Sequence, residues 1–352
     1  MTSATSALKP KVLRLGRIDY GLSKWAEIAK YATVLDCESK TREEFFNDLK
    51  GKYKDITNIS RTYQSVHQTG RFDAELATHL PTTVKSISHT GAGYDQIDPD
   101  PFTKLGIQIS NITVPVEGPT ADTAVYLLLG TLRNFQEGHN LTIQGEWKKG
   151  KKAAGAKLGA TPHSKVVGIL GMGGIGRQIR DRLVPFQFKD IIYYNRKRLT
   201  PELEQSSKYV SFEELIKQSD ILVISVPLNP KTRHLISKEV LADLKPGSII
   251  INTARGAVID EAALLESLKS GHLGGFGSDV FEFEPQVPQE LLDLPNVVSL
   301  PHMGTHAWDA IEYMEEWVAE NVESYIFTGK VKSIIPDQYD MVIDPKPLLK
   351  RE

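Results

Sequence analysis

Short apolar runs alternate with helical patterns along most of the 352 residues. The first set of runs predicts strands at Val12–Leu15, Thr33–Leu35, Ile56–Ile59, Val84–Ser88 and Ile107–Asn111. A second set predicts strands at Val166–Leu170, Ile191–Tyr194, Ile221–Ser225, Ser248–Asn252, Gly275–Asp279 and Val297–Leu300. Strands that alternate with helices are typical of βα units and parallel sheets. The pattern therefore predicts an α/β protein with two doubly wound parallel sheets.

A long helical pattern separates the two sets and predicts one helix from about Thr120 to Gln144, because apolar residues recur there at roughly helical spacing. The following segment, up to Lys165, is rich in Lys, Gly and Ala and predicts a surface loop. Further helices are expected at Ile175–Leu183, Phe212–Gln218, Lys238–Leu244 and Glu261–Ser270. A last helix over Ala307–Phe327 precedes a short tail, which we expect to lie across the first domain.

Composition narrows the class of protein. Apolar residues make up 40% and charged residues 24%, and the formal net charge is −2. This balance predicts a globular protein without a nucleic-acid or membrane partner. Cys37 is the only cysteine, which excludes an internal disulfide and favours a reducing compartment. No segment has the roughly 18 consecutive apolar residues of a membrane span, and the polar N-terminus lacks the apolar core of a signal peptide, so we expect a cytoplasmic protein.

The stretch "VVGILGMGGIGRQI" contains a glycine pattern that follows a strand and opens a helix. That context is required for a dinucleotide-binding turn. Gly171 would allow the tight turn, Gly173 would let the backbone approach a pyrophosphate, and Gly176 would let the helix pack close to the strand. The pyrophosphate would then lie at the helix N-terminus. A plain strand-to-helix turn is the alternative.

The next strand ends in Asn195, Arg196, Lys197 and Arg198, about 20 residues after the glycine turn, where dinucleotide-binding proteins usually carry an acid. A carboxylate there would bind the ribose 2′-hydroxyl of NAD and repel the 2′-phosphate of NADP. Arginine instead offers bidentate donors to a phosphate. The sequence therefore predicts NADPH in preference to NADH, with Arg196 as the first candidate for the phosphate contact. A solvated basic turn is the alternative.

Arg255, Glu284 and His302 follow or lie near the ends of three strands of the second set. Ligands bind at the carboxyl ends of strands in open α/β sheets. Arg255 would bind a substrate carboxylate, and protonated His302 would donate a proton to the keto oxygen as hydride arrives. Glu284 would hydrogen-bond the imidazolium and keep it charged near neutrality. Together the three predict reduction of a 2-oxo acid, although each alone has a structural alternative.

These residues also carry a family resemblance. "HTGAGYDQID", "GILGMGGIG", "NTARGAVIDEAAL", "DVFEFEP" and "LPHMGTH" resemble the D-isomer-specific 2-hydroxyacid dehydrogenases over nearly the whole chain. Within that family the chain is most similar to fungal glyoxylate/hydroxypyruvate reductases, and "FEFEPQVPQEL" is also similar to fungal D-mandelate dehydrogenases.

The resemblance implies a discontinuous, flavodoxin-like substrate domain of residues 1–117 plus 308–352 and a Rossmann NAD(P)-binding domain of residues 118–307. It implies that Arg255, Glu284 and His302 are catalytic and that the protein is a homodimer. It implies cofactor contacts from Thr123, Gly171, Met172, Gly173, Gly174, Ile175, Gly176, Pro227, Thr253, Ala254 and Asp279, the last facing the nicotinamide amide. The charge pattern after the next strand adds Asn195, Arg196 and Lys197. Substrate contacts would come from Thr90, Gly91, Ala92 and Gly93, while the neighbouring His89 could line the site or pack. Separately from the resemblance, Arg61 follows a strand predicted in the first set and is a further candidate for a substrate contact.

Three functions remain open at this point. The first is NADPH-dependent reduction of glyoxylate or hydroxypyruvate. The second is the same reaction on bulkier 2-oxo acids, such as phenylglyoxylate or branched-chain keto acids, because the motifs do not define the pocket walls. The third is a nucleotide-sensing protein like the corepressors that share the fold. The absence of a basic tail or partner-binding arm in the sequence argues against the third.

Overall fold

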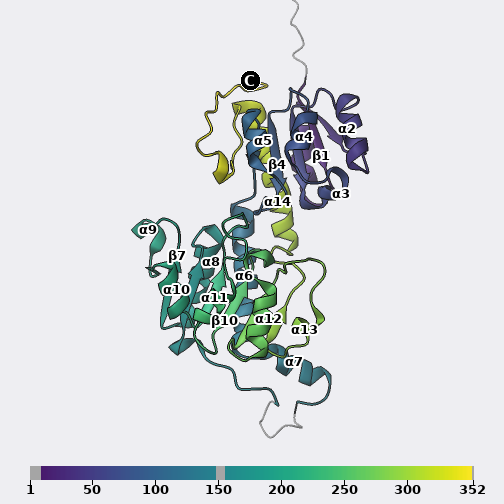
Figure 1. The fold of residues 1–352 in the computed structure, drawn as a ribbon. Helices are drawn as coiled ribbons and strands as arrows, with labels where there is room; N and C mark the ends of the chain where they lie inside the picture. Colours follow the sequence, from purple (N-terminus) through teal and green to yellow (C-terminus); the bar gives the residue numbers. More distant parts are fainter. Residues whose placement is uncertain (1–8, 148–154, 351–352) are drawn as a thin grey trace, which may run out of the picture. The chain divides into compact units, whose positions relative to one another are not determined.

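The computed structural model describes residues 9–147 and 155–350. The predicted loop 145–164 therefore lies partly outside the described residues. The chain divides into two compact units. We call Met1–Val116 with Ala307–Glu352 the N-terminal unit and Glu117–His306 the central unit. Each has its own sheet (Figure 1).

The N-terminal unit contains a five-stranded parallel sheet in the order β2-β1-β3-β4-β5. Its strands are β1 Lys11–Leu15, β2 Thr33–Asp36, β3 Asn58–Thr62, β4 Ser86–Thr90 and β5 Gln108–Ser110. Its helices are α1 Leu22–Ile28, α2 Arg42–Lys50, α3 Val66–Thr69, α4 Ala74–His79, α5 Pro99–Lys104 and α14 Trp308–Thr328. The order is that of a flavodoxin-like sheet. The tail packs on this unit, where Gln338 Oε1 accepts from the Ile109 N–H at 2.7 Å.

The central unit contains a seven-stranded parallel sheet in the order β12-β11-β10-β9-β6-β7-β8. Its strands are β6 Val166–Leu170, β7 Asp190–Tyr194, β8 Lys208–Tyr209, β9 Ile221–Ile224, β10 Ile249–Asn252, β11 Gly275–Ser278 and β12 Val297–Ser299. Its helices are α7 Phe135–Ile143, α8 Gly174–Leu183, α9 Pro201–Glu204, α10 Phe212–Gln218, α11 Lys238–Asp243, α12 Glu261–Lys269 and α13 Gln289–Leu292, together with most of α6 Val114–Leu132. This order reverses at β6, as in a Rossmann sheet, so β6 and β9 flank the switch point where ligands bind.

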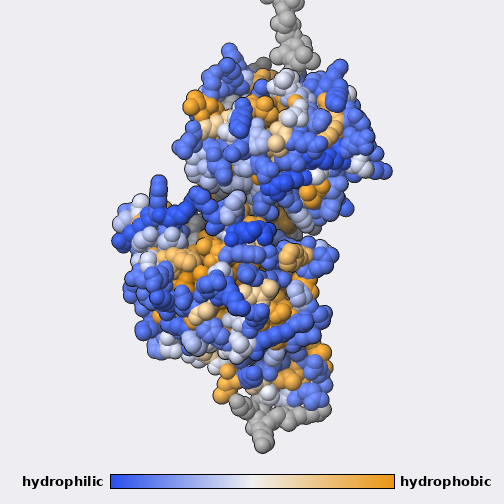
Figure 2. All heavy atoms as spheres, viewed as in Figure 1, coloured by the Kyte–Doolittle hydropathy of each residue, from blue (hydrophilic) through white to orange (hydrophobic). Residues whose placement is uncertain are grey.

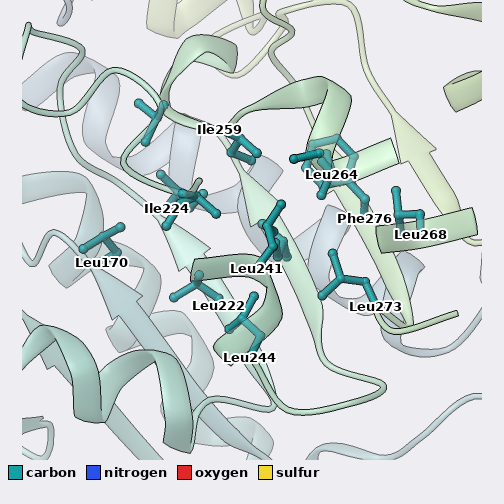
Figure 3. Packing of buried hydrophobic residues seen from close by; sticks show 14 of the residues in the cluster. Leu170, Leu222, Ile224, Leu241, Leu244, Ile259, Leu264, Leu268, Leu273 and Phe276 are labelled. Atoms are coloured by element: carbon teal, nitrogen blue, oxygen red, sulfur yellow. The ribbon is translucent and has the colours of Figure 1, made fainter. Parts of the chain in front are cut away.

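The inner strands of the central sheet, such as β6 and β9, are buried on both faces, which explains why they are continuous apolar runs. Figure 3 shows one face, where Leu241 of α11 and Leu264 of α12 pack with strand residues such as Leu222. On the other face, α6 and α8 contribute buried residues to a second cluster, among them Leu128 and Ile179. The predicted α/β fold is confirmed. None of the described helices combines the length and apolar character that a bilayer span requires.

Two sequence predictions of local structure are wrong. The single helix from Thr120 to Gln144 is two helices, α6 and α7, because Asn134 adopts the left-handed conformation with φ 51°. Asparagine tolerates that conformation better than most residues, and it ends the helical ladder there. The strand predicted at Ile56–Ile59 lies two residues later, at β3. Its polar residues are buried in the sheet, so the apolar pattern missed them.

Candidate active site

The glycine turn joins β6 to α8. Gly171 has φ +98°, and a Cβ there would lie 2.6 Å from the carbonyl oxygen of Ser225. A Cβ at Gly176 would lie 2.2 Å from the carbonyl oxygen of Gly171, so the helix approaches the strand closely. A Cβ at Gly173 would meet no atom within 4 Å. Gly173 is also the N-cap of α8 and offers no side-chain cap, which leaves the first helical N–H groups available for an anion.

The basic segment after β7 contacts this turn. Asn195 Oδ1 accepts a hydrogen bond from the Met172 N–H at 2.7 Å. Arg198 donates from Nε and Nη2 to the carboxylate of Glu204, at 2.9 and 3.1 Å, and the Glu204 side chain is nearly buried. Arg196 and Lys197 are exposed and form no ion pair with any residue that the structure describes. The geometry therefore separates two available cations from a third that is already paired.

The ends of β11 and β12 bring His302 and Glu284 together. His302 Nδ1 lies 2.8 Å from Glu284 Oε2, and Glu284 Oε1 accepts from the Phe281 N–H at 2.9 Å. His302 adopts φ +52°, which is unfavourable for a non-glycine residue. Its N–H donates to the carbonyl oxygen of Asp279 at 2.8 Å. Because Glu284 holds Nδ1, only Nε2 of the imidazole is left for a ligand.

Asp279 fixes the turn that contains His302. Its side chain is buried, and its two carboxylate oxygens accept from the N–H groups of Met303 and Gly304 at 2.7 and 2.8 Å. Burial raises the pKa of Asp279, although these N–H groups and the charge of His302 oppose the rise. Asp279 therefore orients the turn around His302.

Glu284 shows the opposite balance. Burial raises its pKa, but the hydrogen bond from His302, the Phe281 N–H and the charges of His302 and Arg255 outweigh burial and lower it below the usual value. The folded protein therefore favours the ionised form of Glu284 beside His302.

The lowered pKa of Glu284 predicts a pH effect on stability. Its contribution is present above the ordinary pKa of a glutamate and is lost as the pH falls through the lower folded pKa. Between about pH 6 and pH 3, the free energy of unfolding should therefore fall more steeply in the wild type than in Glu284→Gln. Urea denaturation at a series of pH values measures both slopes. Equal slopes would contradict the lowered pKa.

Arg255 follows β10 in a turn that Asn252 holds. The Asn252 side chain donates to the carbonyl oxygen of Arg255 and accepts from the Ala254 N–H, both at 3.0 Å. A Cβ at Gly256 would lie 1.9 Å from the carbonyl carbon of Phe281, so the Arg255 turn packs directly against the turn that contains Glu284. Asn252 was not among the residues predicted for the site, although its place at the end of a strand could have indicated it.

Three other predicted cofactor residues have defined surroundings. Thr123 Oγ1, on α6, donates to the carbonyl oxygen of Gly304 at 3.3 Å, next to the His302 turn. Thr253 follows β10 directly, and its buried Oγ1 has no hydrogen-bond partner among the described residues. The carbonyl oxygen of Pro227 accepts from Thr232 Oγ1 at 2.7 Å. Thr123 and Thr253 thus border the turns described above, while Pro227 lies in the loop after β9.

The predicted substrate residues belong to the N-terminal unit. Thr90 ends β4. Three hydrogen bonds fix the carbonyl oxygens of the glycine loop. Gly91 accepts from the Ile112 N–H at 3.0 Å, Ala92 from Asn111 Nδ2 at 2.7 Å, and Gly93 from His89 Nε2 at 3.0 Å. His89 is 2% exposed, which favours the packing interpretation of this residue.

Arg61 is fully buried in β3. Its Nη2 donates to Gln96 Oε1 at 2.6 Å, and its guanidinium lies 4.7 Å from the centre of the Phe72 ring. Burial lowers the pKa of Arg61 to about 10. The side chain therefore contacts both Phe72 and Gln96, of which Gln96 closely follows the glycine loop.

The chain is similar to known proteins in both sequence and fold. The sequence model described as D-isomer specific 2-hydroxyacid dehydrogenase, NAD binding domain, matches residues 125–304. Glyoxylate reductase 1 of Saccharomyces cerevisiae is 48% identical over 97% of this chain and 99% of its own length. The chain belongs to the D-isomer-specific 2-hydroxyacid dehydrogenase family. The predicted family and the prediction of an enzyme are thereby confirmed.

Two further similarities support this family assignment. The 4-methyl-2-oxopentanoate reductase A of Aspergillus oryzae is 42% identical over 94% of this dehydrogenase and 98% of its own length. The crystal structure of a glyoxylate reductase from Paecilomyes thermophila superposes with a TM-score of 0.90 at 42% identity, covering 94% of this chain and 99% of that one. Both relatives therefore span the two units of the dehydrogenase.

Proposed function

We propose that this dehydrogenase reduces a small 2-oxo acid, glyoxylate or hydroxypyruvate, with NADPH to the 2-hydroxy acid of D configuration. The observation that carries the proposal is the His302–Glu284 pair at 2.8 Å, packed beside the Arg255 turn at the carboxyl edge of the central sheet. The residues present fit a dinucleotide, because the space at Gly173 is open and the N-terminus of α8 is uncapped.

The proposed chemistry assigns one task to each residue. NADPH supplies the hydride when bound. Arg255 binds the substrate carboxylate and polarises the keto oxygen, while His302 donates the proton from Nε2 to that oxygen. Glu284 holds Nδ1 and stabilises the charged imidazole. After the reaction His302 is neutral and Glu284 is still ionised.

The remaining predicted roles are part of the same proposal. Backbone N–H groups of Thr90, Gly91, Ala92 and Gly93 would bind the substrate carboxylate. Because its side chain is buried, Arg61 would act on the substrate loop indirectly, through its hydrogen bond to Gln96. Asp279 would face the nicotinamide amide. The other cofactor contacts would come from Met172, Gly174, Ile175, Thr123, Pro227, Thr253 and Ala254.

Hydroxypyruvate tests the proposed stereochemistry, because its product has a chiral carbon whereas the product of glyoxylate does not. Chiral chromatography of the glycerate formed with NADPH should give the D isomer alone. The L isomer, or a mixture of both, would contradict the proposal.

Preference for NADPH follows from the two available cations after β7. Arg196→Gln should weaken NADPH binding by roughly 10-fold, because a charge-assisted hydrogen bond to the 2′-phosphate is lost, and leave NADH binding nearly unchanged. Fluorescence titration with both nucleotides gives the two Kd values. Lys217→Gln is the control, since it removes an exposed cation paired with Glu213 on α10. Equal losses for both nucleotides in Arg196→Gln would contradict the assignment.

We also propose a cytoplasmic homodimer in which α7 is covered by a second copy. No residue of α7 is buried in the single chain, and Phe135 and Ile143 are 52% and 71% exposed. Figure 2 shows hydrophobic residues at the end of the central unit where α7 lies. Apolar surface of this kind is typical of an interface. Sedimentation of the wild type and of Ile143→Glu measures the contribution of α7 to dimer formation.

The second candidate function is reduction of a bulkier 2-oxo acid. The 42% identity to a 4-methyl-2-oxopentanoate reductase supports it. The residues assigned to proton transfer and carboxylate binding are the same in both cases, so only the substrate preference separates the two candidates.

A further inference from the structure

A second histidine–carboxylate pair lies on the turn that carries Glu284. Glu282 Oε1 accepts from His234 Nε2 at 2.7 Å and from Arg233 Nη1 at 3.0 Å. The Glu282 side chain is 7% exposed, whereas the side chains of Arg233 and His234 are 57% and 40% exposed. A nearly buried carboxylate with two such donors is held firmly in one orientation.

The backbone around Glu282 is also tied to neighbouring elements. The Glu282 N–H donates to Glu261 Oε2, at the start of α12, at 3.1 Å. Burial and the charges of Glu282 and Glu284 raise the pKa of Glu261, although the Glu282 N–H opposes the rise. The His234 N–H donates to the carbonyl oxygen of Ala257 at 2.9 Å, within the turn that follows Arg255. Glu282 thus joins three segments next to the catalytic turns.

Glu284 has few constraints of its own. Its side chain is 35% exposed, and its carboxylate is bonded to His302 and to the Phe281 N–H of the same turn. The direction of the carboxylate therefore depends on how firmly the turn itself is held. Glu282, two residues earlier in that turn, connects it through its side chain to Arg233 and His234 and through its N–H to Glu261.

We propose that Glu282 is a positioning residue that, through Arg233 and His234, sets the orientation of Glu284 and hence of the His302 ring. The inference rests on the proposed roles of Glu284 and His302. A displacement of about 1 Å in a catalytic group can cost up to roughly 100-fold in rate. Loss of the Glu282 bonds should therefore act on the proton-transfer step and spare ligand binding.

The kinetic test compares Glu282→Ala, Glu282→Gln and Glu266→Gln. We expect Glu282→Ala to lower kcat by about 10-fold or more, with KM and the Kd of NADPH within about 2-fold. Glu282→Gln keeps an acceptor oxygen and should recover part of the loss. Glu266→Gln, which removes an exposed carboxylate paired with Lys238, should behave as wild type. An unchanged kcat in folded Glu282→Ala, or equal losses in kcat and in NADPH binding, would overturn the proposal.

A second measurement does not need turnover. The His302 Nδ1–H in its bond to Glu284 should give a downfield proton resonance, assigned by its loss in His302→Asn. We expect the resonance to persist in Glu266→Gln, to broaden or disappear in Glu282→Ala, and to return in part in Glu282→Gln. An unchanged resonance in Glu282→Ala would overturn the positioning role. If the wild type reduced no 2-oxo acid while the resonance depended on Glu282, the proposed function would fail and the positioning role would stand.

Discussion

His302→Asn should lower kcat by roughly 10²- to 10⁴-fold, the range that a positioned general acid contributes. The expected cause is the loss of proton donation from Nε2, because Asn has no group of comparable acidity. Asn is the replacement of choice because it tolerates the φ of +52° at this position. Stopped-flow measurement of NADPH oxidation gives kcat, and fluorescence titration gives the Kd of NADPH, which should change by less than about 2-fold.

His306→Asn is the matched control for this substitution. His306 is exposed and lies four residues further along the same segment. It should keep the wild-type kcat. Full turnover in His302→Asn, or a loss that is entirely due to weaker NADPH binding, would mean that another group donates the proton.

Gly173→Ala and Gly176→Ala should separate cofactor binding from folding. A Cβ at Gly173 meets no protein atom within 4 Å, so Gly173→Ala should melt within about 2 °C of the wild type. If a pyrophosphate approaches this backbone, the same methyl group should weaken NADPH binding by about 10-fold or more. A Cβ at Gly176 would lie 2.2 Å from the Gly171 oxygen, so Gly176→Ala should lower the melting temperature by several degrees.

Thermal unfolding without nucleotide and NADPH titration of both variants check this pair. Lower stability in Gly173→Ala without nucleotide would mean that protein atoms, and not only a ligand, occupy the space beside Gly173. Unchanged NADPH binding in Gly173→Ala would place the pyrophosphate elsewhere.

Burial explains why the sequence predicted some strands more closely than others. Strands β9 and β10 are buried throughout and are apolar except for Asn252 at the end of β10, so their pattern is unambiguous. In β3 the buried residues include Asn58, Ser60 and Arg61, which pair with neighbours that a single sequence does not reveal. The break at Asn134 likewise depends on a single backbone conformation.

In the candidate site, too, some features could be predicted from the sequence and others could not. The carboxyl ends of parallel strands share one edge, so strand prediction alone was enough to place Arg255, Glu284 and His302 near one another. The role of each cation after β7 could not be predicted, because the ion pair between Arg198 and Glu204 depends on how the chain turns at α9. The burial of Arg61 could not be predicted either. A buried arginine needs partners nearby, and a single sequence does not show which residues those partners are.

The most direct test of the central claim is NADPH oxidation by the purified protein with glyoxylate, hydroxypyruvate, phenylglyoxylate and 4-methyl-2-oxopentanoate, each repeated with NADH. The proposed function predicts the highest kcat/KM for glyoxylate or hydroxypyruvate, and with NADPH. A clear preference for phenylglyoxylate or 4-methyl-2-oxopentanoate, or for NADH, would contradict it.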